Sequence, residues 1–191
     1  GVHAKKMFAH FDFDGEISEK LVHQLNSFLP PSIAVKKIFE VKEDFHARFS
    51  AKYRTYEYYI SLEKNPFSEK FAWQHWRKTL DVEKMNEACK ILFEYEDFGS
   101  FAKVGADNKT NICKIYHANW EQNGNELKFT ISADRFLRNM VRAIVGTMVE
   151  IGSGKLKPAD LRNVIEAKNR GVAGTSAPAH ALFLVDVGYD F

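Results

Sequence analysis

The chain has 191 residues, with 27 Lys and Arg against 25 Asp and Glu, so its formal net charge is only +2. Hydrophobic residues make up 45% of the sequence, which is enough for a folded core and argues against a disordered chain. No apolar run of about 18 residues is present, which excludes a membrane-spanning helix. The near-neutral charge does not predict nucleic-acid binding, so any basic surface must come from local clustering of Lys and Arg.

The sequence contains two groups of potential metal ligands, and neither predicts a metal site. Cys89 and Cys113 lie far apart and match no zinc spacing or disulfide framework. They are typical of two reduced thiols in a cytoplasmic protein. His10, Asp12 and Asp14 alternate along one segment, too spread out to converge on a metal without help from elsewhere. The polar outer face of a strand explains them better.

The first 41 residues predict a strand, a helix and a second strand. The chain opens Gly1-Val2-His3 without an initiator Met, and residues 6–13 alternate as in a strand. We interpret a start inside a strand as a sign that the chain is a fragment. Apolar residues at helical spacing over 17–28 predict a helix that Pro30-Pro31 ends, and residues 33–41 alternate weakly.

The remaining elements mix hairpins with helices. Residues 54–62 alternate well and predict a strand, and Asp81 is placed to cap a helix that follows it. Asn123-Gly124 predicts a hairpin between strands 112–122 and 126–133. Helices are expected over 136–151 and after Pro158, and a last strand over 182–189. This order predicts an α+β fold with a largely antiparallel sheet flanked by helices.

Three arginines form a stripe along the helix expected over 136–151. Arg135, Arg138 and Arg142 are spaced i, i+3 and i+7, opposite a wide apolar face. A solvated face is the usual meaning of such a stripe. Partly buried Arg, however, usually pairs with a carboxylate or a phosphate, and only Asp134 is placed to neutralise any of the three, namely Arg138. The pattern therefore slightly favours a functional role.

Basic and aromatic residues are interleaved over 44–56 (DFHARFSAKYRTY). Such interleaving provides phosphate contacts and stacking surfaces together, as in single-stranded nucleic-acid sites. The alternative is a strand whose tyrosines pack in the core while its bases are exposed. Composition alone favours this alternative.

Four stretches together resemble the TruA-type tRNA pseudouridine synthases. They are residues 1–4 (GVHA), 45–58 (FHARFSAKYRTYEY), 136–146 (FLRNMVRAIVG) with its continuation at 150–152, and 177–189 (APAHALFLVDVGY). Residues 97–101 (DFGSF) are a weaker fifth. The stretches span the chain in the family's order, and their combination is much more specific than any one of them.

The resemblance implies a fold and an activity. The expected fold is the pseudouridine synthase fold, with a mixed sheet and a central RNA-binding cleft. Residues 1–40 would be the remainder of a truncated N-terminal half, and residues 41–191 the C-terminal half. The implied reaction is isomerisation of uridine to pseudouridine at positions 38–40 of the tRNA anticodon stem-loop. It implies tRNA as the partner, a homodimer, and no metal, organic cofactor or membrane.

The chain departs from the family at its first residue. In the family an Arg-Thr-Asp-Ala segment precedes Gly-Val-His, and its Asp is the nucleophile. That segment is absent from these 191 residues, so we assign the nucleophile to no residue and expect the chain to be inactive as given. The resemblance implies that Tyr56 stacks on the target uracil and assists deprotonation at C5, and that Arg142 pairs with the missing Asp.

The resemblance also implies substrate-binding residues outside the catalytic pair. Arg48 would occupy the space that the flipped nucleotide leaves, and Arg138 and Lys52 would contact phosphates. His3 would line the pocket next to the lost motif. Two alternatives stay open. One is a non-catalytic RNA-binding module of the same fold, and the other is a generic α+β interaction protein whose arginines pair internally.

Overall fold

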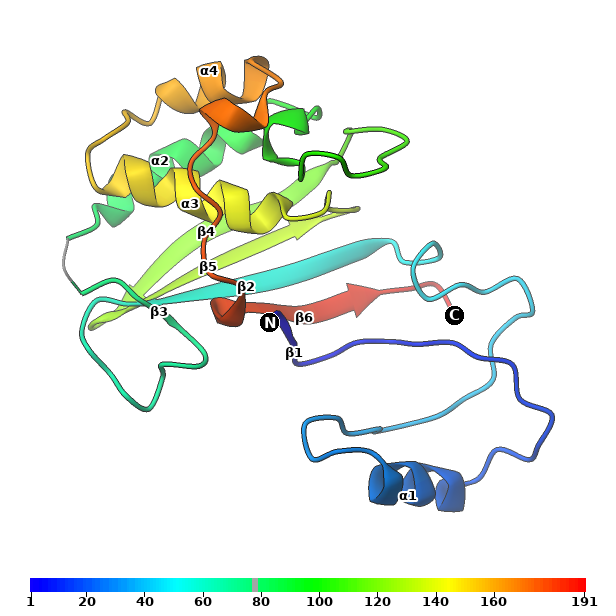
Figure 1. Ribbon diagram of the computed structural model, residues 1–191. Helices are drawn as coiled ribbons and strands as arrows, with labels where there is room; N and C mark the ends of the chain where they lie inside the picture. The colour runs from blue at the N-terminus through cyan, green and yellow to red at the C-terminus, as the bar shows by residue number, and fades with distance from the viewer. Residues whose placement is uncertain (77–78) are drawn as a thin grey trace.

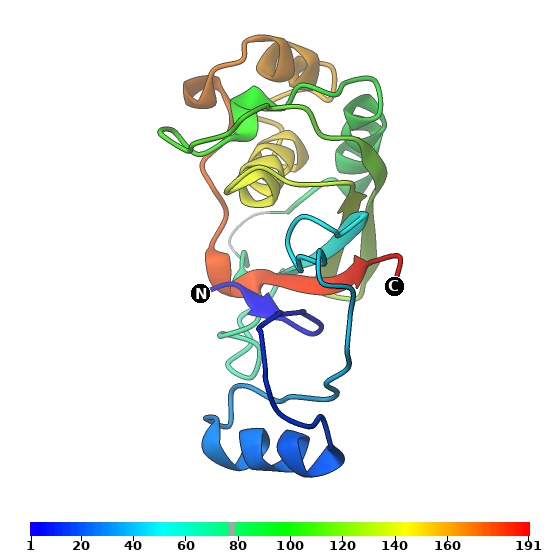
Figure 2. The same ribbon diagram turned by 90° about the vertical axis from the view of Figure 1, so that its right-hand side faces the viewer.

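The computed structural model describes residues 1–76 and 79–191. Within these residues one sheet of six strands has helices on one face and a separate helix beyond the other face (Figures 1 and 2). The elements in chain order are β1 (His3–Ala4), α1 (Glu19–Phe28), β2 (Tyr53–Ser61), β3 (Trp73–Gln74), α2 (Val82–Leu92), η1 (Gly99–Phe101), β4 (Ile115–Asn123), β5 (Glu126–Ala133), α3 (Met140–Gly152), α4 (Asp160–Glu166), η2 (Arg170–Val172), η3 (Ala179–Ala181) and β6 (Leu182–Gly188).

The sheet is mixed and largely antiparallel, which confirms the predicted fold class. The strand order is β1-β6-β2-β5-β4, and β3 also pairs with β2. The central strand β2 is antiparallel to both β5 and β6, whereas β1 runs parallel to β6. The hairpin between β4 and β5 turns at Gly124, whose φ of 57° is the left-handed conformation that a tight hairpin requires.

The core lies between the sheet and helices α2 and α3, and it continues to α4, which packs outside these two helices (Figure 1). Tyr58 and Ile60 of β2 are fully buried, as are Phe129 of β5 and Ile144 of α3. Because side chains alternate along a strand, Tyr56 lies on this core face, while Glu57 and Tyr59 lie on the other. The predicted strand over 54–62 is confirmed as β2. The predicted cap of α2 is also confirmed, since the Asp81 carboxylate accepts a hydrogen bond from the Lys84 N–H.

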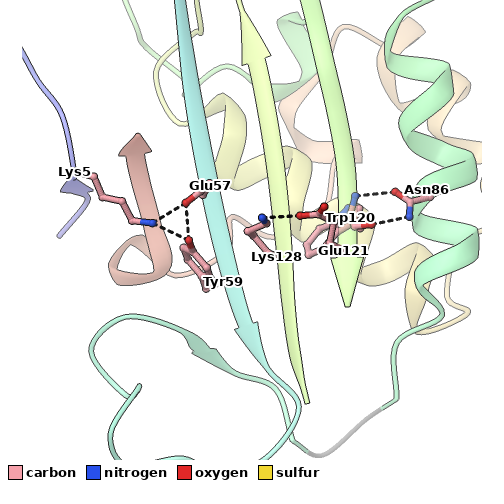
Figure 3. Close-up of polar contacts among 7 residues, drawn as sticks. All are labelled: Lys5, Glu57, Tyr59, Asn86, Trp120, Glu121 and Lys128. Carbon is pink, nitrogen blue, oxygen red and sulfur yellow. Dashed lines mark hydrogen bonds and ion pairs between the residues drawn. The ribbon is translucent and has the colours of Figure 1, made fainter. Parts of the chain in front are cut away.

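Polar contacts fix the outer strands of the sheet (Figure 3). The Lys5 Nζ lies 2.8 Å from both the Glu57 carboxylate and the Tyr59 hydroxyl, and so links the start of the chain to β2. At the opposite edge, the Asn86 side chain of α2 accepts from the Trp120 N–H at 2.7 Å and donates to the Trp120 carbonyl at 2.9 Å. Asn86 thereby satisfies backbone groups that an edge strand would otherwise leave unpaired.

The prediction of two strands near the N-terminus is wrong. Residues 6–13 and 33–41 form no strand, and of the opening segment only His3–Ala4 pairs with the sheet. A strand needs a neighbour for its backbone groups. No strand in the described residues extends alongside these segments, and the alternating apolar residues Met7, Phe11 and Phe13 are exposed. The helix expected over 17–28 is confirmed as α1, although none of its residues is buried.

The helix expected over 136–151 begins four residues later than predicted. It starts at Met140 because Asn139 has a φ of 70°, which ends any helical run before it. Arg135 and Arg138 therefore lie in the loop before α3, and the predicted stripe of three arginines along one helix is wrong. No helix in the part of the chain that the structure describes is long and apolar enough to cross a membrane.

Candidate active site

Tyr56 and Phe136 pack against each other on the core face of the sheet. Tyr56 sits in the middle of β2 on the core face, and its ring meets the Phe136 ring edge-on, with 5.2 Å between centroids. Burial raises the pKa of the Tyr56 phenol, and the nearby Arg54 charge only partly opposes this effect. Tyr56 is therefore a neutral phenol at neutral pH, able to stack through its ring and to exchange hydrogen bonds through its hydroxyl.

Arg142 enters the site from α3. Its Nε donates a hydrogen bond to the Ala177 carbonyl at 2.6 Å, and the Ala177 N–H donates to the Arg142 carbonyl at 3.0 Å. Close by, the Tyr58 hydroxyl donates to the Pro178 carbonyl at 2.9 Å. Burial raises the pKa of Tyr58, while the positive charge of Arg142 acts in the opposite direction. Arg142 and Tyr58 thus converge on residues 177–178, just before β6.

In the part of the chain that the structure describes, the arginines near this site have no acidic partner. Within the described residues, Arg162 forms the one ion pair between an arginine and a carboxylate, with Glu94. The Asp134 carboxylate accepts from the N–H groups of Lys114 and Arg135 instead of pairing with Arg138. This result disfavours the alternative in which the arginines pair internally, and it leaves Arg142 with an uncompensated positive charge.

The first residue of the chain lies next to the same segment. Strand β1 runs parallel to β6, with His3 opposite Phe183. A Cβ placed on Gly1 would lie 3.4 Å from the Cβ of Ala179. The Gly-Val-His start is therefore packed beside the residues on which Arg142 and Tyr58 converge, although it is remote from them in sequence.

His3 faces away from Tyr56. Its ring stacks on Phe183 with 4.8 Å between centroids, and Phe183 in turn meets Tyr59 edge-on. Because Tyr59 is on the outer face of β2, the structure does not bring the His3 side chain together with Tyr56 and Arg142. Instead, His3 borders a pocket with Gly1, Lys70, Trp73 and His180, among others.

The other predicted binding residues lie on the surface around the site. Arg48 is exposed with its guanidinium 5.6 Å from the Phe49 ring centroid, and Lys52 is ion-paired to Asp190. Arg138 is exposed in the loop before α3, and its carbonyl accepts from the Lys103 N–H at 2.9 Å. All three are accessible to a large anionic substrate, and they do not meet in a single pocket.

Sequence reasoning missed Arg54. It lies two residues before Tyr56 on the same face of β2, and it donates to the carbonyls of Asp134 and Arg48. It joins the strand to the loop before α3 and places a positive charge beside Tyr56. The alternation of β2 would have placed it on this face.

The donor set favours no metal centre. Among the residues that the structure describes, no group of three or more His, Cys, Asp or Glu could hold a metal ion. Both cysteines are buried and free, and burial raises the pKa of the Cys89 thiol to about 12 and that of the Cys113 thiol to about 11. Neither is a reactive thiolate at neutral pH.

The fold is α+β, with a mixed sheet that carries helices on one face. Residues 88–190 match the model of the tRNA pseudouridine synthase family. Together these findings define a pseudouridine synthase domain. The chain is 56% identical to tRNA pseudouridine synthase A of Parabacteroides distasonis, over 99% of this chain and 75% of that protein. It is 55% identical to the enzyme of the same name from Bacteroides fragilis (99% and 76%) and 39% identical to that from Bacillus subtilis (100% and 78%). The chain belongs to the tRNA pseudouridine synthase A family.

Family membership confirms the resemblance and the fold class, and it implies tRNA as the substrate. The roles of Tyr56, Arg142, Arg48, Lys52, Arg138 and His3 stay predictions, as does the division of the chain at residue 40.

Proposed function

We propose that the full-length protein converts uridine to pseudouridine at positions 38–40 of the tRNA anticodon stem-loop. In this proposal the 191 residues supply Tyr56 and Arg142, and the nucleophilic Asp comes from a segment before Gly1. One observation carries the proposal. Gly1 packs beside Ala179, directly after the carbonyls to which Arg142 and Tyr58 donate. A residue immediately before Gly1 would therefore extend from a point beside the segment 177–179, to which the Arg142 guanidinium is bonded.

The proposed reaction makes one bond to carbon for each bond that it breaks. The carboxylate attacks C1′ and displaces N1 of the uracil, which rotates. C5 then bonds to C1′ and displaces the carboxylate, C5 loses its proton, and N1 takes up a proton. The attacking carboxylate must be ionised in a desolvated pocket. A guanidinium nearby favours that state and can lower a carboxylate pKa by about 1–3 units. Arg142 suits this role because no carboxylate within the described residues already neutralises it.

Tyr56 acts through both its ring and its hydroxyl. The target base must leave the stem, which costs a few kcal/mol, and stacking on an aromatic ring returns about 1–3 kcal/mol. The raised pKa of Tyr56 keeps the phenol protonated. We therefore propose that the hydroxyl relays the C5 proton through hydrogen bonds rather than acting as a preformed phenolate base.

The arginines and lysines around the site would hold the RNA backbone. Arg48, Lys52 and Arg138 are exposed, and phosphate contacts of this kind make affinity fall steeply with salt. We further propose that the full-length protein is a homodimer that holds the tRNA in a central cleft, and that residues 1–40 belong to its N-terminal half.

The test compares the full-length protein with the 191-residue chain on tRNA carrying tritium at C5 of uridine, after intact-mass measurement of both. We expect tritium release from the full-length protein and none from the chain of 21.9 kDa. Release by that chain would contradict the assignment of the nucleophile to a preceding segment. If the full-length protein binds tRNA without release, the protein is a non-catalytic RNA-binding module instead.

A further inference from the structure

A short segment before β6 crosses α3 so closely that the backbones of the two pack against each other. We call residues 173–177 the crossing segment; in Figure 1 it is the orange coil that runs from α4 past α3 toward β6. A Cβ on Gly146 of α3 would lie 1.8 Å from the Thr175 carbonyl oxygen. The Gly174 N–H donates to the buried Thr147 hydroxyl at 2.9 Å. The crossing segment ends at Ala177, whose carbonyl accepts from Arg142.

Ser176 is held from two sides. The Asn139 side-chain amide donates to the Ser176 hydroxyl oxygen at 2.6 Å, and the Arg170 guanidinium donates to the same oxygen at 2.8 Å. Arg170 also donates to the Ala173 carbonyl at 3.2 Å. These bonds fix the residue directly before Ala177, and therefore the carbonyl that Arg142 contacts.

Asn139 has an unusual backbone conformation. Its φ of 70° and ψ of −1° place it in the left-handed region, three residues before Arg142. Lys168 is the one other non-glycine residue with positive φ in the described residues. Asn tolerates this conformation better than most residues, and such conformations persist where the surrounding structure enforces them, often at active sites.

We infer that Asn139 and Ser176 are positioning residues for the isomerisation. Asn139 directly precedes α3, so its backbone conformation sets where the helix begins and which way Arg142 points. Its side-chain amide holds Ser176. Ser176 keeps the Ala177 carbonyl against the Arg142 Nε, so the guanidinium has one orientation toward the nucleophile. The inference rests on the proposed function, and within it assigns the orientation of Arg142 to two residues that need not touch the substrate.

Loss of this positioning should lower kcat, because the guanidinium assists the reaction only when it is aligned with the reacting groups. A displacement of about 1 Å in an active site can lower the rate about 100-fold. The left-handed backbone and the amide bond are separable in Asn139. Gly adopts this backbone conformation without strain but lacks the amide. Ala lacks the amide and is also strained in this conformation.

The experiment measures kcat and KM for pseudouridine formation in the full-length protein with Asn139→Gly, Asn139→Ala and Ser176→Ala. We expect kcat to fall about tenfold in Asn139→Gly and Ser176→Ala and about 100-fold in Asn139→Ala, with KM for tRNA changed less than about twofold. Because the two side chains share one bond, the Asn139→Gly/Ser176→Ala double variant should be no slower than the slower single variant.

Asn86→Ala is the matched control, since Asn86 also makes two hydrogen bonds but lies at the far edge of the sheet. It should lower the melting temperature and leave kcat unchanged. An unchanged kcat in Asn139→Gly and Ser176→Ala, effects that multiply in the double variant, or losses confined to KM would overturn the inference. Inactivity of the unmutated full-length protein would instead refute the proposed function.

Discussion

At the scale of single residues, the environment of Tyr56 limits what its hydroxyl can do. Burial raises the pKa of the phenol above its ordinary value, so ionisation at neutral pH is unfavourable. Packing against Phe136 holds the ring, and this contact does not depend on the hydroxyl. Ring and hydroxyl can therefore be tested separately.

Tyr56→Phe in the full-length protein removes the hydroxyl and keeps the ring. We expect kcat for tritium release to fall by about 10²–10⁴-fold, the usual contribution of proton transfer by a positioned side chain. Affinity for tRNA should be unchanged, because stacking is retained. Release rates and filter binding measure the two effects. Full activity would remove the hydroxyl from the mechanism but not the ring; Tyr56→Leu, which lacks both, is the comparison.

Arg142 and Arg138 form a natural pair for a second test. Arg142 is half-buried and bonded to Ala177, whereas Arg138 is exposed. Lys keeps the charge but not the forked geometry. We expect Arg142→Lys to lower kcat by about 10²–10³-fold, as when one oriented donor is lost from a site. Arg138→Lys should leave kcat unchanged, and Arg138→Ala should weaken tRNA binding and reduce its salt dependence. Steady-state kinetics at two salt concentrations separates these outcomes; equal kcat losses in both Lys variants would contradict the assignment.

Part of the site could be predicted from the sequence. The alternation of 54–62 places Tyr56 on a defined face, and the family motifs single out Arg142. The same alternation would have included Arg54. The positions of Arg135 and Arg138 could not be obtained in this way, because their apparent helical spacing is interrupted by the left-handed Asn139. No periodicity could reveal that residues 173–177 cross α3 and hold Arg142.

At the scale of elements, the close packing of the crossing segment on α3 outweighs helix propensity at Gly146. Ala is favoured over Gly in a helix interior by about 0.5–1 kcal/mol, so propensity alone predicts that Gly146→Ala stabilises the protein. The structure predicts the opposite, because the new Cβ would lie 1.8 Å from the Thr175 carbonyl oxygen. The segment would have to move away from the helix.

We therefore expect Gly146→Ala to lower the free energy of unfolding of the 191-residue chain by about 1–3 kcal/mol, the usual cost of overpacking. Urea denaturation monitored by circular dichroism measures it. Gly105→Ala serves as a comparison, since Gly105 has positive φ but nothing within 4 Å of an added Cβ, so only backbone strain is expected there. A stabilised Gly146→Ala variant would show that the crossing segment does not pack on α3 as described.

The elements that could be predicted are those whose pattern and partners lie in the same stretch of chain. The β4–β5 hairpin is local, and α2 carries its own cap at Asp81. The prediction of strands over 6–13 and 33–41 is wrong because alternation indicates only a preference for extended backbone. A strand also requires a neighbouring strand to pair with. The pairing of β1 with β6 joins residues about 180 positions apart and has no local signal.

At the scale of the whole molecule, the two sides of the sheet differ in how well they are covered. Helices α2 and α3 cover one face, with α4 packed outside them, whereas α1 lies beyond the other face and buries none of its residues (Figure 2). The well-packed side contains the two cysteines, with exposed fractions of 2% for Cys89 and 0% for Cys113. Stability of the molecule should therefore depend on the ionisation of groups on this side.

The buried thiols predict a loss of stability at alkaline pH. Burial raises the pKa of Cys89 from 9.0 to about 12 and that of Cys113 from 9.0 to about 11. The unfolded chain releases these protons first, so the stabilisation is fully present below pH 9 and is lost as pH rises toward the folded-state values. Between pH 9 and 10 the free energy of unfolding should fall by about 1 kcal/mol for each thiol. Denaturant titrations under reducing conditions measure this slope. Cys89→Ala/Cys113→Ala should be less stable at neutral pH and should keep only the shallower slope that buried tyrosines such as Tyr56 and Tyr58 contribute, because burial raises their pKa values too. An equal slope in variant and wild type would contradict the prediction.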